Sequence, residues 1–191
     1  VLIFTEWILP VTKFFKDRGI TTIYSERIDA HHILTNPDYG NYIDFCDYLL
    51  SNSLRAKHRI EDYFKRDVRL IHNGKKSVDI LDAAEHKRIR DILVPCRIAP
   101  IKNLEIVLEM FEKYKDKHSD FMIRFVGEIQ VEEYANKLKR YVDENSLWDN
   151  VVFTGFTRDM RKEYERTQLV ILPSLGEGTP NVVLEAFAYG S

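Results

Sequence analysis

The sequence contains only two cysteines among its 191 residues, and Cys46 and Cys96 stand fifty positions apart without a Cys-x-x-Cys pair. This usage favours two free thiols in a reducing compartment over a disulfide or a shared metal ion. An excess of one charge is missing as well, because 28 Lys and Arg are balanced by 30 Asp and Glu. A net charge of −2 provides no global field to attract nucleic acid or an anionic membrane, so any anion site must be local.

Long hydrophobic runs are absent too, since runs such as residues 1–4 and 7–11 fall far short of the roughly 20 residues that span a bilayer. No strand-like run is followed by Gly-x-Gly-x-x-Gly, which argues against a dinucleotide dehydrogenase. The sequence has no Asp-x-Asp pair or other set of metal ligands, and we expect neither a metal nor a cofactor. With 45% hydrophobic and 12% aromatic residues, the chain can nevertheless build an ordinary globular core.

Strand-like and helix-like patterns alternate from Asp67 to the end of the sequence. Strands are expected in residues 67–74, 91–96, 121–126, 151–155 and 169–174, and helices in residues 103–115, 131–145, 160–166 and from 180 onward. This alternation predicts an α/β fold with a Rossmann-like parallel sheet and helices on both faces. Ligands of such sheets bind at the carboxyl ends of the strands, here the loops that begin at Arg97, Gly127, Gly155 and Leu175.

The first part of the chain is less regular, with strands expected in residues 1–7, 21–27 and 47–53 and a helix in residues 10–19. We interpret residues 1–53 as the C-terminal part of a second α/β domain, residues 54–66 as a charged helical connection, and residues 67–191 as the ligand-binding domain. The sequence starts at Val1 inside a strand-like run and stops at Ser191 without a tail. We therefore expect an excised piece in which both domains are incomplete.

The stretch PSLGEGTPNVVLEAFAYGS, residues 173–191, is typical of an anion site at a helix start. Thr179 suits the N-cap and Pro180 the first helical turn. The next N–H groups, from Asn181 to Val183, are expected to lack intrahelical partners and, with the helix dipole, to bind a phosphate. Gly176 and Gly178 would let the backbone approach the ligand closely.

Two glutamates flank this helix start. Glu185 would lie about 7 Å along the axis, too far to hold the phosphate but suited to accept hydrogen bonds from a diol. Glu177, in the preceding loop, could accept from hydroxyls on the other side, while Val182, Val183, Ala186 and Phe187 would form the buried face. A phosphate between two diols describes a nucleotide sugar. Each glutamate taken alone is explained more simply as a surface acid.

The whole stretch resembles the Glu-x7-Glu signature of retaining glycosyltransferases of family 4 and their GT-B relatives. Four further segments resemble motifs of that family in the same order: CDYLLSNS with RLIHNG, LVPCRIAPIKNLEIVLEMF, IRFVGE and VVFTGF. Together the motifs cover roughly Cys46 to Ser191. The resemblance implies a GT-B fold, in which residues 67–191 form a nearly complete C-terminal domain that follows the end of the N-terminal one.

The resemblance also implies roles for individual residues. Arg97 and Lys102 would neutralise the donor diphosphate, Glu185 would bind the ribose hydroxyls, and Glu177 would contact the C3 and C4 hydroxyls of the donor sugar. Residues with backbone amides for sugar and phosphate would be Gly178, Thr179, Pro180 and Asn181, and the strand ends that complete the donor site would be Gly127 and, near the base, Gly155, Phe156 and Thr157. No metal is implied.

Two positions depart from the family pattern. Cys96 stands where the family usually has Gly before the Arg. At the acceptor side, the strand end YSERID places Glu26 and Arg27 at the cleft, as in members that build surface polysaccharides. The nearby pair His31 and His32 is more simply solvated than catalytic.

The sequence is thus interpreted as part of a retaining, metal-independent glycosyltransferase that moves a sugar from a nucleoside-diphosphate sugar to a saccharide or lipid-linked acceptor. The implied setting is surface polysaccharide or glycolipid synthesis in the cytoplasm, including the inner face of the membrane, without nucleic acid. The alternatives are a non-catalytic nucleotide-sugar-binding module and, less favoured, a nucleotide-sugar 2-epimerase. We expect residues 1–191 alone to lack transferase activity and to self-associate through an uncovered sheet edge.

Overall fold

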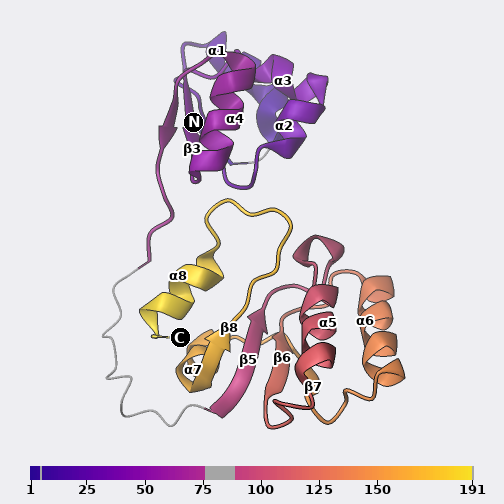
Figure 1. Cartoon of the computed structure of the whole chain (residues 1–191). Helices are drawn as coiled ribbons and strands as arrows, with labels where there is room; N and C mark the ends of the chain where they lie inside the picture. The colour runs from indigo at the N-terminus through magenta and orange to yellow at the C-terminus, as the bar shows by residue number, and fades with distance from the viewer. Residues whose placement is uncertain (5, 76–88, 191) are drawn as a thin grey trace. The chain divides into compact units, whose positions relative to one another are not determined.

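A computed structural model describes residues 1–4, 6–75 and 89–190 of the chain (Figure 1). The chain divides into two compact units. The first consists of Val1–Gly74 with the short segment Gly176–Thr179, and the second of Lys75–Leu175 with Pro180–Ser191. Each unit has a parallel four-stranded sheet and a hydrophobic core of its own, which confirms the predicted α/β class.

The strands of the first unit pair in parallel in the order β1-β2-β3-β4. They are β1 (Leu2–Ile3), β2 (Ile23–Glu26), β3 (Tyr48–Ser51) and β4 (Val68–Leu70). The helical segments are the 3-10 helix η1 (Glu6–Val11) and the α-helices α1 (Thr12–Lys16), α2 (His31–Thr35), α3 (Pro37–Ile43) and α4 (Leu54–Phe64). One buried cluster joins the strands to η1, α2, α3 and α4 through side chains such as Tyr24, Leu49 and Ile60.

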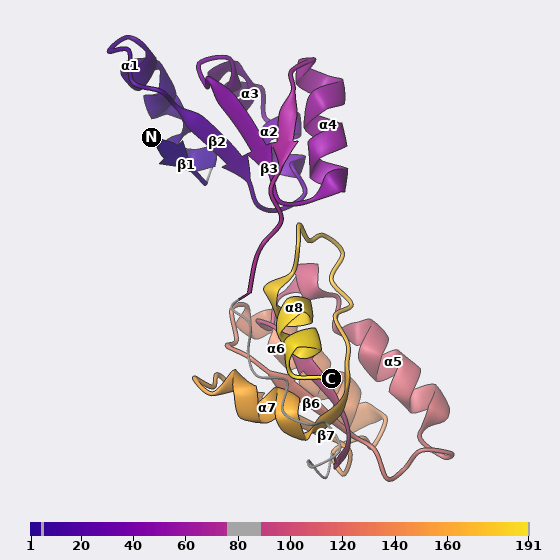
Figure 2. The same cartoon turned by 90° about the vertical axis from the view of Figure 1, so that its left-hand side faces the viewer.

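The sheet of the second unit has the order β7-β6-β5-β8, again with every pair parallel. Its strands are β5 (Ile89–Pro95), β6 (Met122–Val126), β7 (Val151–Gly155) and β8 (Thr167–Val170). Its helices are η2 (Pro100–Lys102), α5 (Glu105–Tyr114), α6 (Glu132–Glu144), α7 (Met160–Arg166) and α8 (Asn181–Ala188). Because side chains alternate along a strand, Ile92 and Val94 pack with α5 and α6, whereas Leu93 packs with α7 and α8 on the other face (Figure 2).

The boundary between the units differs from the one expected from the sequence. Helix α4 and strand β4 belong to the first unit, because β4 pairs with β3 and Val68 is buried in the first core. The Arg66 guanidinium also donates hydrogen bonds of 2.6 Å to the carbonyls of Ile43 and Cys46. Residues 54–66 therefore belong to a βαβ unit within the first sheet, with α4 as its crossover helix, and the division falls after Gly74.

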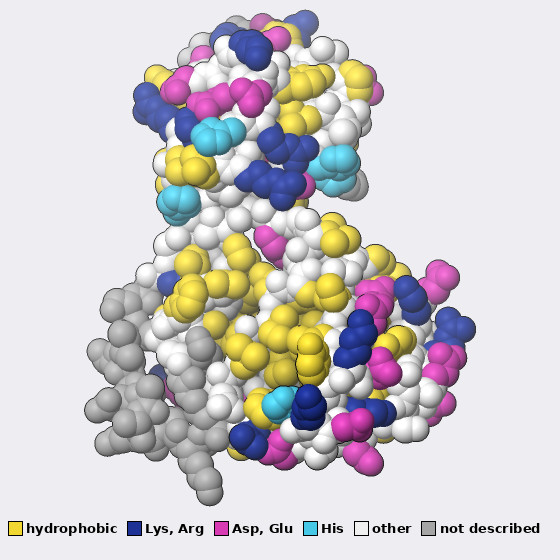
Figure 3. All heavy atoms as spheres, viewed as in Figure 1, with side chains coloured by type: hydrophobic (Ala, Val, Ile, Leu, Met, Phe, Trp, Pro, Cys, Tyr) yellow, Lys and Arg dark blue, Asp and Glu magenta, His cyan; other side chains and the backbone are white. Residues whose placement is uncertain are grey.

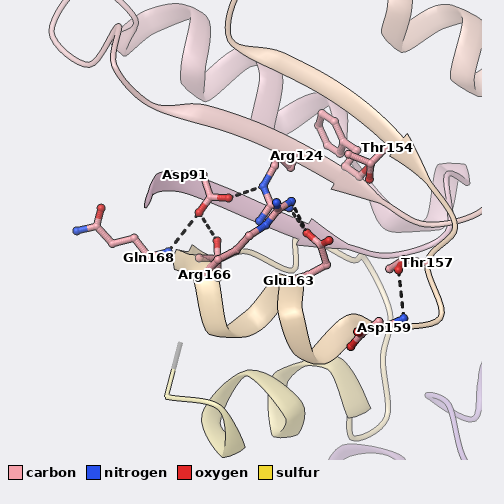
Figure 4. A network of polar contacts seen from close by, with 10 residues as sticks. Asp91, Arg124, Thr154, Thr157, Asp159, Glu163, Arg166 and Gln168 are labelled. Carbon is pink, nitrogen blue, oxygen red and sulfur yellow. Dashed lines mark hydrogen bonds and ion pairs between the residues drawn. The ribbon is translucent and has the colours of Figure 1, made fainter. Parts of the chain in front are cut away.

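A polar network anchors α7 to the second sheet (Figure 4). Arg124 on β6 forms ion pairs with the fully buried Asp91 on β5 and with Glu163 on α7. Thr167 and the Gln168 N–H donate to the other Asp91 oxygen at 2.5 and 3.3 Å. The network fixes α7 against the strands that it crosses.

Hydrophobic side chains gather on the face of the second unit seen in Figure 3, over the region between β8 and α5. A groove of about 320 Å³ is found there, with Met110, Phe121, Leu169 and Ile171 among its lining residues. None of the described helices is both long enough and apolar enough to cross a membrane.

Candidate functional site

The carboxyl ends of β5, β6 and β7 continue past the sheet as hydrogen-bonded loops. The Cys96 N–H donates to the Val126 carbonyl at 3.1 Å, and the Gly127 N–H donates to the Gly155 carbonyl at 2.9 Å. Farther along, the Ile98 N–H donates to the Glu128 carbonyl at 2.8 Å. Parallel pairing therefore brings three of the predicted donor-site loops to one edge of the second unit.

Gly127 permits the closest of these approaches. A Cβ atom at this position would lie 1.9 Å from the Cys96 carbonyl oxygen, so no larger residue fits without moving the backbone. Gly155 ends β7 with a φ of 74°, a conformation that favours glycine. After it, Phe156 is exposed, and the Thr157 hydroxyl accepts a hydrogen bond of 3.1 Å from the Asp159 N–H.

The loop after β5 carries the two predicted phosphate-binding cations. Arg97 is exposed, and its guanidinium makes no hydrogen bond or ion pair with another residue in the described part of the chain. Lys102 is half-buried at the end of η2. Asn103, the first residue of the helix expected at 103–115, instead ends η2 with a φ of 51°, and Leu104 is the N-cap of α5.

A second loop is tied to this one. The Asn103 side chain donates to the Pro173 carbonyl at 3.4 Å, and the Leu175 N–H donates to the Ile101 carbonyl at 3.0 Å. Pro173 and Leu175 lie between β8 and α8. The backbone on both sides of Lys102 is thereby joined to the segment that leads toward α8.

The start of α8 differs in detail from the prediction. Pro180, with extended backbone angles, occupies the N-cap position, so Thr179 lies one residue before the cap. The Thr179 hydroxyl donates to the Asn52 carbonyl. The Val183 N–H donates to the Pro180 carbonyl at 3.2 Å. Contrary to the expectation, this N–H group is therefore not available to an anion. Any phosphate contact of this helix must therefore come from its first two residues.

Glu185 lies on α8, half-buried, with both carboxylate oxygens engaged. The Tyr164 hydroxyl on α7 lies 3.0 Å from one oxygen, and the Lys75 ammonium contacts the other. A cavity of about 390 Å³ opens beside this carboxylate, with Arg158 and Arg161 also in its wall. Burial, and next the negative charge of Glu185, raise the pKa of Tyr164 above its usual range, so the hydroxyl keeps its proton.

The remaining predicted site residues belong to the first unit. The buried Glu26 accepts hydrogen bonds of 2.9 and 2.8 Å from the Arg27 and Ile28 N–H groups and one of 2.9 Å from the Tyr24 hydroxyl. Its carboxylate therefore shapes the turn after β2. Arg27 is exposed and donates to the Asn73 side chain at 2.5 Å.

The glycine-rich segment before α8 is counted with this first unit. Asn73 donates to the Thr179 carbonyl at 2.7 Å. A Cβ atom on Gly178 would lie 2.6 Å from the Arg27 carbonyl oxygen, so this segment also packs closely. Glu177 is half-buried within it.

Sequence reasoning missed Tyr164, Lys75, Arg158 and Arg161. The only signal at Tyr164 is that it is the one aromatic residue of the charged helix α7. The contact of Lys75 with Glu185 joins residues 110 positions apart, which no local pattern reveals.

Residues 89–191 match the family described as Glycosyl transferases group 1. An exopolysaccharide phosphotransferase of Streptomyces coelicolor is 32% identical to this chain over 102 residues, which are 53% of this chain and 10% of that protein. The chain therefore spans about a tenth of the length of this curated relative.

Two solved structures show the same fold over nearly the whole chain. A mutant of TarM from S. aureus, in complex with fondaparinux, α-GlcNAc-glycerol and UDP, has a TM-score of 0.82 at 17% identity. The match covers 96% of this chain and 38% of the TarM chain. Anabaena HepE in complex with UDP-glucose has a TM-score of 0.79 at 18% identity, over 100% of this chain and 58% of its own. The fold of the described residues is thus of the GT-B type, as predicted.

Proposed function

We propose, from the premise that this chain belongs to the family Glycosyl transferases group 1, that it binds a nucleoside-diphosphate sugar and takes part in transferring the sugar to a saccharide acceptor. The observation that carries the proposal is the edge of the second sheet. There the loop of Arg97 and Lys102 is hydrogen-bonded to the segment that leads toward α8, the helix of Glu185. One unit thus supplies two cations for a diphosphate and a carboxylate for a diol.

In the proposed reaction, the acceptor hydroxyl attacks C1 of the donor sugar on the face that the nucleoside diphosphate leaves, so the configuration at C1 is retained. Negative charge grows on the diphosphate as its bond to C1 breaks. Arg97 and Lys102 stabilise that charge, helped by the positive end of the α8 dipole. The Arg97 guanidinium is suited to this task, because it gives up no partner among the described residues to bind phosphate.

The two glutamates bind different parts of the donor. Glu185 accepts hydrogen bonds from the ribose hydroxyls, and Glu177 accepts from hydroxyls of the sugar. The backbone N–H groups of Gly178, Thr179 and Asn181 lie beside the sugar and the phosphate. The base lies near Gly155, Phe156 and Thr157. UDP in the TarM complex and UDP-glucose in the HepE complex support a donor of this class. The acceptor is a saccharide or a lipid-linked saccharide of a cytoplasmic pathway for surface polysaccharides.

The two glutamates should separate in their effects on binding and turnover. Glu185→Ala is expected to weaken binding of the free nucleoside diphosphate about tenfold, because a charge-assisted hydrogen bond to ribose forms with or without the sugar. Glu177→Ala should leave that binding within about twofold of the wild type while lowering turnover of the sugar donor.

Calorimetric titration with UDP, GDP and ADP measures binding, and release of labelled sugar measures turnover in a protein that contains both complete domains. The matched control is Glu144→Ala, which removes an exposed glutamate at the end of α6 and should change neither. Equal loss of nucleotide binding in both site variants, or in neither, would show that the roles are misassigned. Because residues 1–191 alone are expected to lack transferase activity, only binding without turnover by a protein that contains both complete domains would favour a binding module.

A further inference from the structure

We propose that Tyr164 is a positioning residue, which holds the Glu185 carboxylate in the orientation that accepts both hydroxyls of the donor ribose. This inference rests on the proposed function, because it presupposes that Glu185 binds the ribose. The Tyr164 hydroxyl lies 3.0 Å from one Glu185 oxygen, and the tyrosine side chain is fully buried. Nothing in the motif around Glu185 assigns a role to this tyrosine.

Tyr164 is held rigidly in place. Its ring packs with Leu93, Val126 and Ala186, and it stacks on the Tyr189 ring with centroids 5.8 Å apart and an interplanar angle of 11°. The helix that carries it is anchored by the adjacent residue, because Glu163 pairs with the buried Arg124 (Figure 4). A hydroxyl on such a support can move little, so the carboxylate bonded to it is also restrained.

The second contact of Glu185 is of a different kind. Lys75 reaches the other carboxylate oxygen with a flexible side chain that is 38% exposed. Water and ligand hydroxyls can replace an exposed ammonium at little cost, whereas a buried hydroxyl is costly to separate from its acceptor. On binding, the ribose hydroxyls would therefore exchange with Lys75 while the tyrosine contact stays in place.

The geometry of a vicinal diol explains why orientation matters. Two adjacent hydroxyls donate to one carboxylate only when its plane faces both, and a carboxylate that rotates freely loses entropy when it is fixed by the ligand. The cavity beside Glu185, about 390 Å³, has Tyr164 and Lys75 in its wall and leaves room for a ligand next to the carboxylate. Tyr164 would thus fix part of the orientation of the Glu185 carboxylate before the donor binds.

A pair of ligands separates positioning from general support of the fold. We would titrate the protein with UDP and with 2′,3′-dideoxy-UDP, which lacks both ribose hydroxyls. Tyr164→Phe is expected to weaken UDP binding about fivefold and to leave the dideoxy ligand within about twofold. In a Glu185→Gln background, Tyr164→Phe should add less than about twofold to the loss of UDP affinity, because it acts through the carboxylate.

The control variant is Tyr141→Phe, which removes a hydroxyl from α6, outside the cavity that Glu185 faces. It should alter neither affinity. Equal weakening of both ligands by Tyr164→Phe would show a structural role only, and no weakening of UDP would show that Tyr164 does not orient Glu185; either result overturns the inference. Wild-type protein that binds both ligands equally would instead contradict the ribose role of Glu185. If UDP does not bind, GDP or ADP and its dideoxy form replace the pair, and if none binds, the proposed function and this inference fail together.

Discussion

Arg124→Leu is expected to lower the free energy of unfolding by about 3–5 kcal/mol, the range for breaking a buried ion pair by removing one partner. Asp91, which is fully buried, would keep its bonds to Thr167 and the Gln168 N–H but lose the opposite charge. Glu163 would lose its link to the sheet at the same time. Urea denaturation followed by circular dichroism measures the change.

The chain contains a matched control for this substitution. Arg90 on β5 pairs with Asp120, but these side chains are 64% and 51% exposed, so water already solvates both charges. Arg90→Leu should therefore change the unfolding free energy by no more than about 1 kcal/mol. Similar losses in the two variants would mean that burial does not decide the importance of the Arg124 pair.

Arg97→Ala is expected to weaken nucleoside-diphosphate binding by roughly 1.5–3 kcal/mol, the range for a hydrogen bond to a charged group. The guanidinium has no ion-pair partner among the described residues, so its removal leaves none of their charges unpaired. Folding stability should consequently stay within about 0.5 kcal/mol of the wild type. Loss of affinity without loss of stability is the signature of a ligand-binding residue.

Isothermal titration calorimetry gives the affinity, with Arg140→Ala as the control, because Arg140 is an exposed arginine on α6. This control should bind the nucleotide as the wild type does. Unchanged affinity in Arg97→Ala would show that Arg97 does not contact the nucleotide. Any binding would then have to come from the residues of α8.

The order of strands and helices was predictable because each obeys a local period. The short helix expected at residues 160–166 is α7, Met160–Arg166, and each of the four later strands lies inside its expected range or overlaps it. The unit boundary was not predictable in this way. Strand β4 has only three residues, and no local pattern indicates whether it joins the preceding or the following sheet.

The sequence indicates which residues belong to the candidate site, but it does not predict which side chains are buried or which groups they contact. Phe187 was expected to be buried, yet it is 71% exposed, because α8 is apolar on most sides and its period does not choose a face. Thr179 looks like a helix cap in sequence, but Pro180 occupies the N-cap position, and the Thr179 hydroxyl donates to the carbonyl of Asn52, 127 positions away. Asp91 and Arg124 lie in runs that read as buried strands, and only the sheet register brings them together.

The most direct test of the account is whether a nucleoside diphosphate stabilises the folded protein. Binding at a hundred times the dissociation constant adds about 2.7 kcal/mol, which corresponds to a rise of several degrees in melting temperature. We expect one of UDP, GDP and ADP at millimolar concentration to produce this rise in the wild-type protein, and a smaller rise in Arg97→Ala. No rise with any of the three, under conditions where the protein is folded, would contradict the assignment of a nucleotide-sugar site to this chain.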